Sequence, residues 1–302
     1  MSSMFAVGGI DLDGPVMIAA GVCKTPESVG PWMASAASAV ESGSYTPKEN
    51  AGNDGKLFHP ETLEEFERLG YGLNSFGMPN VGYELAADKF AMMRLEKPLI
   101  VSIAGRNMQD YLDGMRIFSQ CDTVAAIEFN FGCPNETHGG RIISFDASGI
   151  RDILNGIYGP KPIWMKVSPY SDPMLLKEIA GIVNESDKIR AVVTCNTFPN
   201  AYVDTNAISP NGGLAGLSGP ALKPIALGQV VQWRKHLKSD IDVIGVGGIM
   251  TGNDIVDFLD AGARAVQIAS CAFWSGEPRR LGEWLTADGT SERFQALLAS
   301  RG

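Results

Sequence analysis

VIGVGGIMTGND, at residues 243–254, and AVQIAS, at residues 265–270, follow one another near the end of the chain. Each contains a short run rich in β-branched residues, which favours a β-strand, and the first run leads through two glycines to a helix start. Ile255, Phe258 and Leu259 recur at helical spacing between the two runs. Strand, helix and strand in this order predict a parallel β/α unit.

The same alternation extends over the whole sequence. Short apolar runs bounded by turn residues are candidate strands at residues 16–21, 39–42, 99–104, 125–129, 163–167, 191–196, 243–246 and 265–269. The second run is the weakest, because it is short and polar. Amphipathic stretches at 172–183, 220–237 and 254–261 fit helices between the strands. Eight such units in 302 residues predict an α/β fold, a (β/α)8 TIM barrel that forms one domain over residues 1–302.

Three connections are too long for plain barrel turns, at residues 45–80, 132–148 and 197–219, and all are rich in glycine, asparagine and proline. Long ordered loops in a compact domain are usually functional. Each of them follows a candidate strand, so each is expected at the C-terminal mouth of the barrel, where barrel active sites are built.

The composition indicates which binding partners and which cellular compartment to expect. The formal net charge of −9 opposes binding to nucleic acid or an anionic membrane. No run of about 18 apolar residues and no export signal occur, so we expect a protein of the cytoplasm. The five cysteines form no CxxC pair, which also favours a reducing compartment, and the three histidines lack partners at metal-ligand spacing. We expect no metal site.

The run EFNFGCPN, at residues 128–135, ends a candidate strand with two amides and a thiol. Gly132 and Pro134 make a sharp turn around Cys133, whose thiol could act as a nucleophile or a general base there. At an unperturbed pKa near 8.5 most of this thiol is protonated at neutral pH. A buried cysteine that packs as a small hydrophobe is the commoner case, so the context must decide.

Other polar residues stand at strand ends. Lys166, in PIWMKVSP, could meet an anion or a developing negative charge, or could be a lysine that reaches the surface. The double glycine before the last strand lies where barrels often bind phosphate through backbone N–H groups. YGLNSFGMPN, at 71–80, and TCNT, at 194–197, add amides. A single asparagine is most often a turn former, but amides gathered at one mouth can hold a planar polar ligand.

Taken together, the ordered motifs resemble the class 1 dihydroorotate dehydrogenases along nearly the whole chain. They are AAG (19–21), NSFGMPN (74–80), FGCPN (131–135), WMKVSP (164–169), TCNT (194–197), GGLAGLSGPALKPIAL (212–227), GVGGI (245–249) and QIAS (267–270). The resemblance implies an FMN-dependent oxidoreductase that oxidises (S)-dihydroorotate to orotate in de novo pyrimidine biosynthesis. Cys133 would take a proton from carbon 5 while a hydride passes from carbon 6 to flavin N5.

The resemblance also implies two sets of binding residues. The substrate would contact Asn74, Ser75, Phe76, Gly77, Met78, Asn130, Asn135, Asn196 and Thr197. FMN would contact Ala20, Gly21, Ser44, Asn130, Lys166, Cys195, Ser218, Gly219, Gly247, Gly248, Ala269 and Ser270. Lys166 would lie near flavin N1 and O2 and stabilise the reduced anion.

One position departs from the family. Members usually carry a lysine directly before the serine of the loop after the second strand, whereas here Gly43 precedes Ser44. A charge-assisted contact of that kind contributes roughly 1.5–3 kcal/mol, enough to change substrate preference. Lys24 or Lys48 could substitute for it. Otherwise the substrate is another cyclic amide or enone; a third alternative is a noncatalytic flavin-binding barrel.

The resemblance leaves the electron acceptor open. The HGG of CPNETHGG, at 133–140, is closer to the NAD-linked subclass, whose members work with an iron–sulfur flavoprotein partner, than to the fumarate-using subclass. The chain carries no cluster motif of its own, so use of NAD would require that partner. The family also implies a homo-oligomer, most simply a homodimer.

Overall fold

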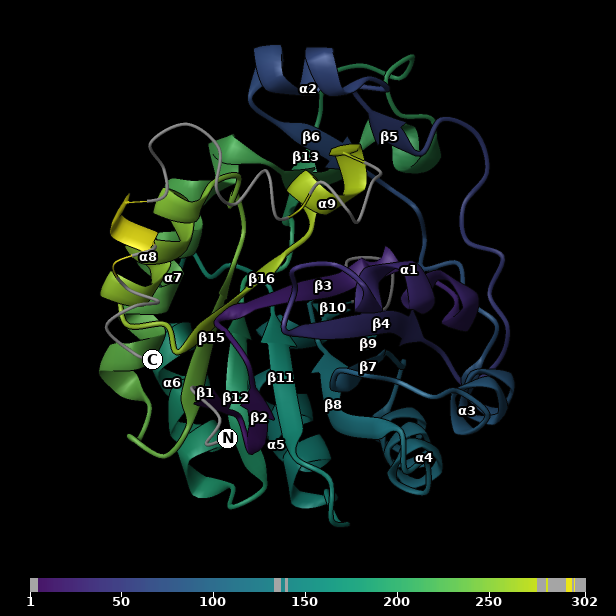
Figure 1. Ribbon diagram of the computed structural model, residues 1–302, viewed down its shortest axis with the longest axis vertical. Helices are drawn as coiled ribbons and strands as arrows, with labels where there is room; N and C mark the ends of the chain where they lie inside the picture. Colours follow the sequence, from purple (N-terminus) through teal and green to yellow (C-terminus); the bar gives the residue numbers. More distant parts are fainter. Residues whose placement is uncertain are drawn as a thin grey trace.

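The computed structural model describes residues 5–132, 137–138, 141–275, 281, 292–294 and 296. Eight parallel strands close into a barrel in the order β11-β12-β15-β16-β3-β4-β7-β8 (Figure 1). They are β3 (Val16–Cys23), β4 (Ala39–Tyr45), β7 (Leu99–Ile103), β8 (Val124–Asn130), β11 (Ile163–Val167), β12 (Ile189–Thr194), β15 (Asp242–Val246) and β16 (Ala265–Ile268). The predicted (β/α)8 barrel and its eight strands are confirmed.

Helices follow most of the strands and pack on the outside of the barrel. They are α1 (Val29–Met33), α3 (Tyr83–Ala91), α4 (Met108–Ser119), α5 (Ala147–Asn155), α6 (Pro173–Glu185), α7 (Lys223–His236) and α8 (Gly252–Asp260). Several begin at a side-chain cap: Asn107, Asp146, Asp172 and Thr251 each accept a hydrogen bond from a backbone N–H of the first turn. Short 3₁₀ turns η1 (Pro26–Ser28), η2 (Ile143–Phe145), η3 (Pro210–Gly213) and η4 (Pro220–Leu222) lie in the loops.

The weakest predicted strand proves to be longer than expected. The run at 39–42 becomes β4, which continues to Tyr45 and is buried along its whole length. Its polar residues Glu41, Ser42 and Ser44 are 1%, 0% and 9% exposed. The expected end was wrong because these side chains are paired inside the protein, so their polarity does not indicate contact with solvent.

Two of the long connections fold together into a second sheet above the barrel mouth. The connection after β4 contributes β5 (Phe58–His59), α2 (Leu63–Leu69) and β6 (Gly72–Asn74), and the connection after β12 contributes β13 (Phe198–Ala201) and β14 (Ala215–Ser218). These strands form an antiparallel sheet in the order β13-β14-β6-β5. Figure 1 shows this sheet with α2 at the top of the molecule, and α9 (Ser270–Ser275) near it.

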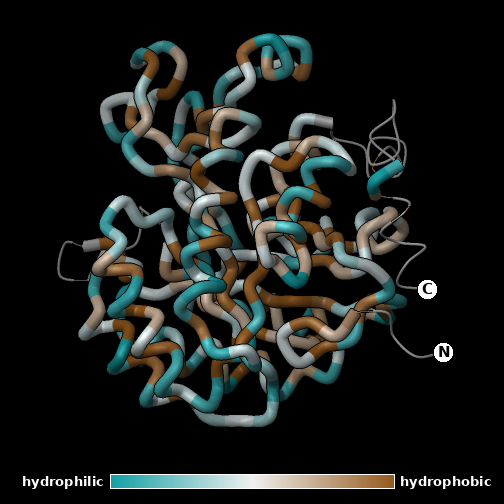
Figure 2. The backbone as a smooth tube through the Cα atoms, turned by 90° about the vertical axis from the view of Figure 1, so that its left-hand side faces the viewer, coloured by the Kyte–Doolittle hydropathy of each residue, from teal (hydrophilic) through white to brown (hydrophobic). Residues whose placement is uncertain are grey.

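The opposite end of the barrel is closed by the N-terminal hairpin of β1 (Phe5–Val7) and β2 (Ile10–Leu12). Phe5, Val7 and Leu12 belong to the apolar cluster that fills the lower barrel interior. The indole of Trp164 donates a 2.9 Å hydrogen bond to the carbonyl of Gly8, which ties the hairpin to β11. In Figure 2 the strands in the middle of the body are largely hydrophobic, whereas the surrounding helices alternate in hydropathy.

The remaining short pair, β9 (Thr137–His138) and β10 (Arg141–Ile142), is antiparallel and lies in the third long connection. Among the described residues, no helix is long and apolar enough to cross a membrane.

Candidate active site

A pocket of about 570 Å³ opens at the C-terminal mouth of the barrel, beneath the upper sheet. Its floor consists of strand ends, with Ala20 and Gly21 from β3, Ser44 from β4, and Asn130 from β8. Its walls come from the two long connections that form the upper sheet. Two of the three long connections that were expected at the mouth, residues 45–80 and 197–219, therefore enclose one cavity.

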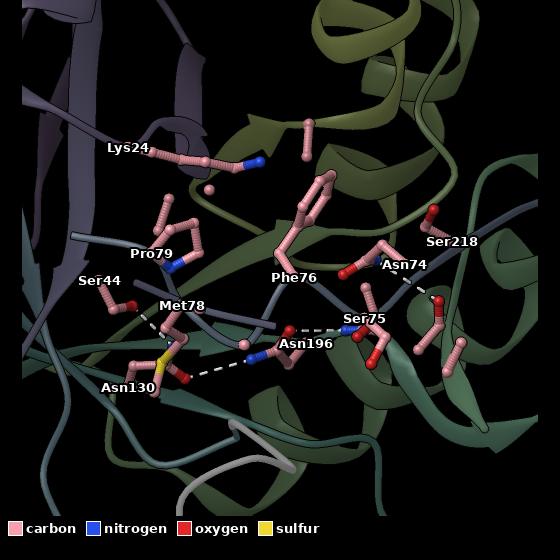
Figure 3. A pocket seen from close by; sticks show the side chains of 18 of the residues that line it. Lys24, Ser44, Asn74, Ser75, Phe76, Met78, Pro79, Asn130, Asn196 and Ser218 are labelled. Carbon is pink, nitrogen blue, oxygen red and sulfur yellow. Dashed lines mark hydrogen bonds between the residues drawn. The ribbon is translucent and has the colours of Figure 1, made fainter. Parts of the chain in front are cut away.

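Amide side chains form a connected row on the floor of this pocket (Figure 3). The Nδ2 of Asn130 donates a 2.8 Å hydrogen bond to the hydroxyl of Ser44, and its Oδ1 accepts one of 3.2 Å from Asn196 Nδ2. Asn196 Oδ1 in turn accepts a 2.8 Å bond from the backbone N–H of Thr197. Because each amide is oriented by its neighbour, the row presents a fixed set of donors and acceptors to a ligand.

A second layer of amides holds the segment 74–80 against the pocket. Asn50 Nδ2 donates to the carbonyl of Gly77 at 2.9 Å, and Asn53 Nδ2 donates to that of Ser75 at 2.9 Å. Asn211 Nδ2 reaches the Ser75 hydroxyl at 3.2 Å from the other long connection. Asn50, Asn53 and Asn211 also line the cavity and were not singled out from the sequence.

The charge of the pocket is opposite to that of the chain. Lys24, Arg106 and Lys166 line it, and the described lining residues include no carboxylate. Lys166 lies on the barrel side, where its ammonium is 3.8 Å from Glu128 Oε1. A pocket with three cations in a protein of net charge −9 favours a ligand that carries negative charge.

Lys24 lies at the upper side of the cavity, directly after β3. Its Nζ is 3.1 Å from the centroid of the Phe76 ring and 5.5 Å from that of Phe273 (Figure 3). Burial lowers the pKa of Lys24 to about 8, because an ammonium away from water loses solvation. Lys48, the other candidate cation, is exposed and is not among the lining residues.

The backbone at Gly43 explains why no side chain is present there. Its φ of +116° lies in a region that L residues rarely adopt. A Cβ built on Gly43 would lie 2.4 Å from the carbonyl oxygen of Ser102 on the adjacent β7. A lysine at this position would therefore strain the backbone and clash with the next strand.

The barrel floor also fits an FMN molecule. A Cβ built on Gly21 meets no atom within 4 Å, so glycine there leaves the floor open to a flat ring. Eight residues predicted to contact the cofactor line the cavity: Ala20, Gly21, Ser44, Asn130, Lys166, Ser218, Ala269 and Ser270. Backbone groups, hydroxyls and a cation are the donors that a flavin ring and its phosphate require.

Four predicted cofactor contacts lie outside the lining residues. Cys195 is 2% exposed, its thiol lies 3.7 Å from the carbonyl oxygen of Val246, and burial raises its pKa to about 12. Gly219, Gly247 and Gly248 have positive φ angles next to the pocket, and their contacts stay a prediction.

Of the predicted substrate contacts, Asn74, Ser75, Phe76, Gly77, Met78, Asn130, Asn196 and Thr197 all line the cavity. Asn135 and the candidate base Cys133 lie outside the described residues. Sequence reasoning missed Arg106 and the apolar wall formed by Phe273 and Trp274. Arg106 follows β7 in SIAGRN, and its position after a strand is the signal that could have found it.

Comparison with known proteins identifies the family. The family model described as "Dihydroorotate dehydrogenase" matches residues 4–279. The chain is 32% identical over 274 residues to the "Dihydroorotate dehydrogenase B (NAD(+)), catalytic subunit" of Geobacter sulfurreducens, with 88% of this chain and 86% of that protein covered. It is 32% identical over 244 residues to the protein of the same name from Methanopyrus kandleri, with 78% and 74% covered.

A solved structure supports the fold independently. The crystal structure of DHODH from Eimeria tenella in complex with ferulenol superposes with a TM-score of 0.78 and 19% identity, over 98% of this chain and 84% of that chain. At this identity the likeness concerns the fold alone.

The closed barrel and its cationic, amide-lined mouth define a β/α-barrel protein with a pocket that suits an anionic ligand with polar edges. The chain belongs to the dihydroorotate dehydrogenase family, as its motifs predict. This family consists of oxidoreductases that act on CH–CH donors.

Proposed function

We propose that this chain is an FMN-dependent dihydroorotate dehydrogenase, which oxidises (S)-dihydroorotate to orotate in pyrimidine biosynthesis. The observation that carries the proposal is the pocket at the barrel mouth, in which three cations and a row of oriented amides face one cavity. Dihydroorotate suits such a pocket, because it is a small ring with polar edges and a carboxylate. The names of relatives at about 32% identity support the same reaction.

FMN, when bound, supplies the acceptor for the hydride that leaves carbon 6 of the substrate. The residues that would hold its ring are Ala20, Gly21, Ser44, Asn130 and Lys166, on the pocket floor. Its phosphate would meet the backbone N–H groups around Ser218, Gly219, Gly247, Gly248, Ala269 and Ser270. Lys166 places a positive charge in this floor, 3.8 Å from Glu128. This positive charge favours the reduced, anionic state of a flavin.

The chain's own residues orient the substrate and move its proton. Asn130 and Asn196 would hold the ring edges through the hydrogen-bonded row, and Asn74, Asn135 and Thr197 would complete the set. Cys133 would act as the base that removes the proton from carbon 5.

Lys24 takes the place of the cation that Gly43 lacks. Its ammonium lies inside the cavity over Phe76, whereas Lys48 is exposed and outside it. A carboxylate that enters the pocket can accept a hydrogen bond from Lys24 and gain roughly 1.5–3 kcal/mol. The proposal therefore keeps dihydroorotate as the substrate despite the departure at Gly43.

The two relatives named above are catalytic subunits, which favours the same role for this chain. We infer a cytoplasmic homodimer that passes its electrons to an iron–sulfur flavoprotein partner and through it to NAD. The isolated chain would then reduce its flavin with dihydroorotate but would not reduce NAD.

The test is an anaerobic titration of the purified yellow protein with L-dihydroorotate, followed by flavin absorbance. Fast bleaching of the wild type, together with loss of bleaching in Cys133→Ala at unchanged FMN content, is the expected result. If dihydroorotate does not bleach the flavin, the result would favour another cyclic amide or enone as the substrate. Turnover by Cys133→Ala at neutral pH would remove Cys133 as the base.

A further inference from the structure

The middle layer of the barrel interior is polar. Five inward-facing side chains from five strands meet there: Glu41 of β4, Ser102 of β7, Glu128 of β8, Lys166 of β11 and Gln267 of β16. In most β/α barrels, branched apolar side chains fill this layer. Below it the interior is apolar again, so the polar layer lies between the pocket floor and the lower core.

The side chains of this layer contact one another directly. Gln267 Nε2 donates to Glu41 Oε2 at 2.7 Å and to Glu128 Oε2 at 3.4 Å, so one amide bridges the two carboxyl groups. Glu41 Oε2 also accepts a 3.1 Å bond from the backbone N–H of Ala20. Lys166 Nζ lies 3.8 Å from the other oxygen of Glu128.

The negative and positive charges of the layer do not balance if every group is ionised. Glu41, Glu128 and Lys166 are 1%, 0% and 4% exposed, so two carboxylates and one ammonium would leave a net buried charge of −1. An uncompensated buried charge is strongly destabilising. Glu41 Oε1 and Gln267 Oε1 also have no hydrogen-bond donor among the described residues. A proton on Glu41 would remove the excess charge and turn Oε1 into a donor.

The surroundings of Glu41 favour its protonated form. Burial, the nearby charge of Glu128 and a hydrogen bond between the two carboxyl groups raise the pKa of Glu41 well above its usual range. The charge of Lys166 acts in the opposite direction but is outweighed. Cys23 of β3 is the other titratable neighbour, and burial raises its pKa to about 12, which keeps it neutral.

We propose that Glu41 and Glu128 hold a single proton between them, so that the barrel interior gives Lys166 one carboxylate counter-charge rather than two. The two residues then act as positioning residues beneath the active-site floor. Neither is among the residues that line the pocket. This inference concerns the charge of the fold itself and holds whichever substrate the enzyme takes.

The layer is joined to the pocket by a directed chain of hydrogen bonds. Ser102 donates to Glu128 Oε1 at 3.1 Å, so Ser44, whose hydroxyl is 2.8 Å away, must donate to Ser102. Asn130 donates to Ser44, and Asn196 donates to Asn130 (Figure 3). This series of hydrogen bonds ends at the carboxylate of Glu128, which can only accept. That end therefore fixes the donor and the acceptor of every bond in the series, and with them the edge of each amide that faces the ligand.

The test compares Glu41→Gln, Glu128→Gln and the double variant, all purified with FMN, by urea unfolding between pH 5.5 and 8.5. Each single variant keeps one carboxylate for Lys166, whereas the double variant keeps none. We expect the double variant to lose more stability than the two single losses added together. Additive losses would contradict a shared proton, because each carboxylate would then act alone.

The pH dependence supplies the second readout. The pKa of Glu41 is raised in the folded state, so its contribution to stability is present at low pH and is lost as the pH rises. The unfolding constant of the wild type, divided by that of Glu41→Gln, should rise up to about tenfold per pH unit above the unfolded-state pKa of about 4.3. A ratio that does not change with pH would show that Glu41 is ionised.

An infrared measurement on the holoprotein keeps the proposal testable if a variant fails to fold. The wild type at pH 7 should show the carbonyl band of a protonated carboxylic acid, and both single variants should lack it, since the remaining glutamate ionises. Absence of the band from the wild type would overturn the proposal.

Discussion

The ammonium of Lys24 lies over the face of Phe76, 3.1 Å from the ring centroid, inside the pocket at the barrel mouth. Lys24 follows β3, and Phe76 belongs to the segment between β6 and α3. A ring face attracts a cation but supplies no counter-charge. The positive charge of Lys24 is therefore available to an anionic ligand, and burial already lowers its pKa to about 8.

Replacing Lys24 by methionine keeps an apolar stem of similar size and removes the charge. We expect the affinity of the oxidised protein for orotate to fall roughly tenfold to a hundredfold, because a charge-assisted hydrogen bond is lost. Titration of the flavin absorbance with orotate measures the dissociation constant. Lys48→Met is the matched control and should leave it unchanged. Equal affinities in Lys24→Met and the wild type would show that Lys24 does not hold the carboxylate.

The lowered pKa of Lys24 predicts how ligand affinity depends on pH. Below about pH 8 the ammonium is charged and attracts a carboxylate; above it the neutral amine does not. The dissociation constant for orotate should therefore rise with pH above about 8, by up to tenfold per unit, in the wild type. The Lys24→Met variant should lose this rise. If both proteins show the same pH profile, another group is responsible.

Gly43→Lys should not restore the cation that the family resemblance leads us to expect at this position. The positive φ of Gly43 and the approach of its hypothetical Cβ to Ser102 O predict a loss of about 1–3 kcal/mol in the free energy of unfolding. Urea denaturation measures it. Gly181→Ala, on an open face of α6, is the control and should stabilise by up to about 1 kcal/mol. A stable Gly43→Lys protein would mean that β4 and β7 can separate locally.

The barrel was predictable because its signal is local. Each strand is a short apolar run, and each connecting helix shows apolar residues at helical spacing and a residue that ends it. The end of β4 was missed because Ser44, beyond the predicted end at residue 42, is buried and hydrogen-bonded in a polar interior that no local pattern reveals. The upper sheet was missed for another reason. It pairs Asn74 of β6 with Gly216 of β14, and this register depends on contacts between distant segments.

The candidate site was predictable where its residues follow strands. Asn130, Lys166 and Asn196 end or follow barrel strands, so topology alone brings them to one mouth. Asn53 and Asn211 were not predictable in this way. Each is a lone asparagine in a long connection, and their common contact with Ser75 appears only when the two connections fold together.

Asp254→Ala should weaken FMN binding, although Asp254 is not one of the predicted cofactor contacts. Asp254 Oδ2 accepts hydrogen bonds from the backbone N–H groups of Met250 and Thr251 at 2.9 and 2.8 Å, and Oδ1 pairs with Lys223. These bonds shape the loop after β15, whose two glycines are predicted to meet the phosphate. We expect a loss of about 2 kcal/mol in stability and a higher dissociation constant for FMN. Fluorescence titration of the apoprotein measures the latter.

Asp257→Asn is the control for this loop. Asp257 also pairs with Lys223, at 2.8 Å, but it accepts no hydrogen bond from the loop after β15 in the described structure. Its replacement should leave FMN affinity close to that of the wild type. A similar loss in both variants would assign the effect to the ion pairs rather than to the loop.

Asn130→Asp changes one amide nitrogen to oxygen in the floor of the pocket and should disable the site while the fold persists. The new carboxylate cannot donate to Ser44, as Asn130 Nδ2 does at 2.8 Å, although it can still accept from Gly132 and Asn196. It also adds a negative charge where a carboxylate ligand must bind. We expect orotate affinity to fall at least tenfold in the flavin titration. Asn200→Asp adds the same charge at an exposed residue of the cavity lining that takes no part in the hydrogen bonds of this row. If both variants lose affinity equally, charge alone accounts for the effect and the directed hydrogen bonds of the floor do not contribute.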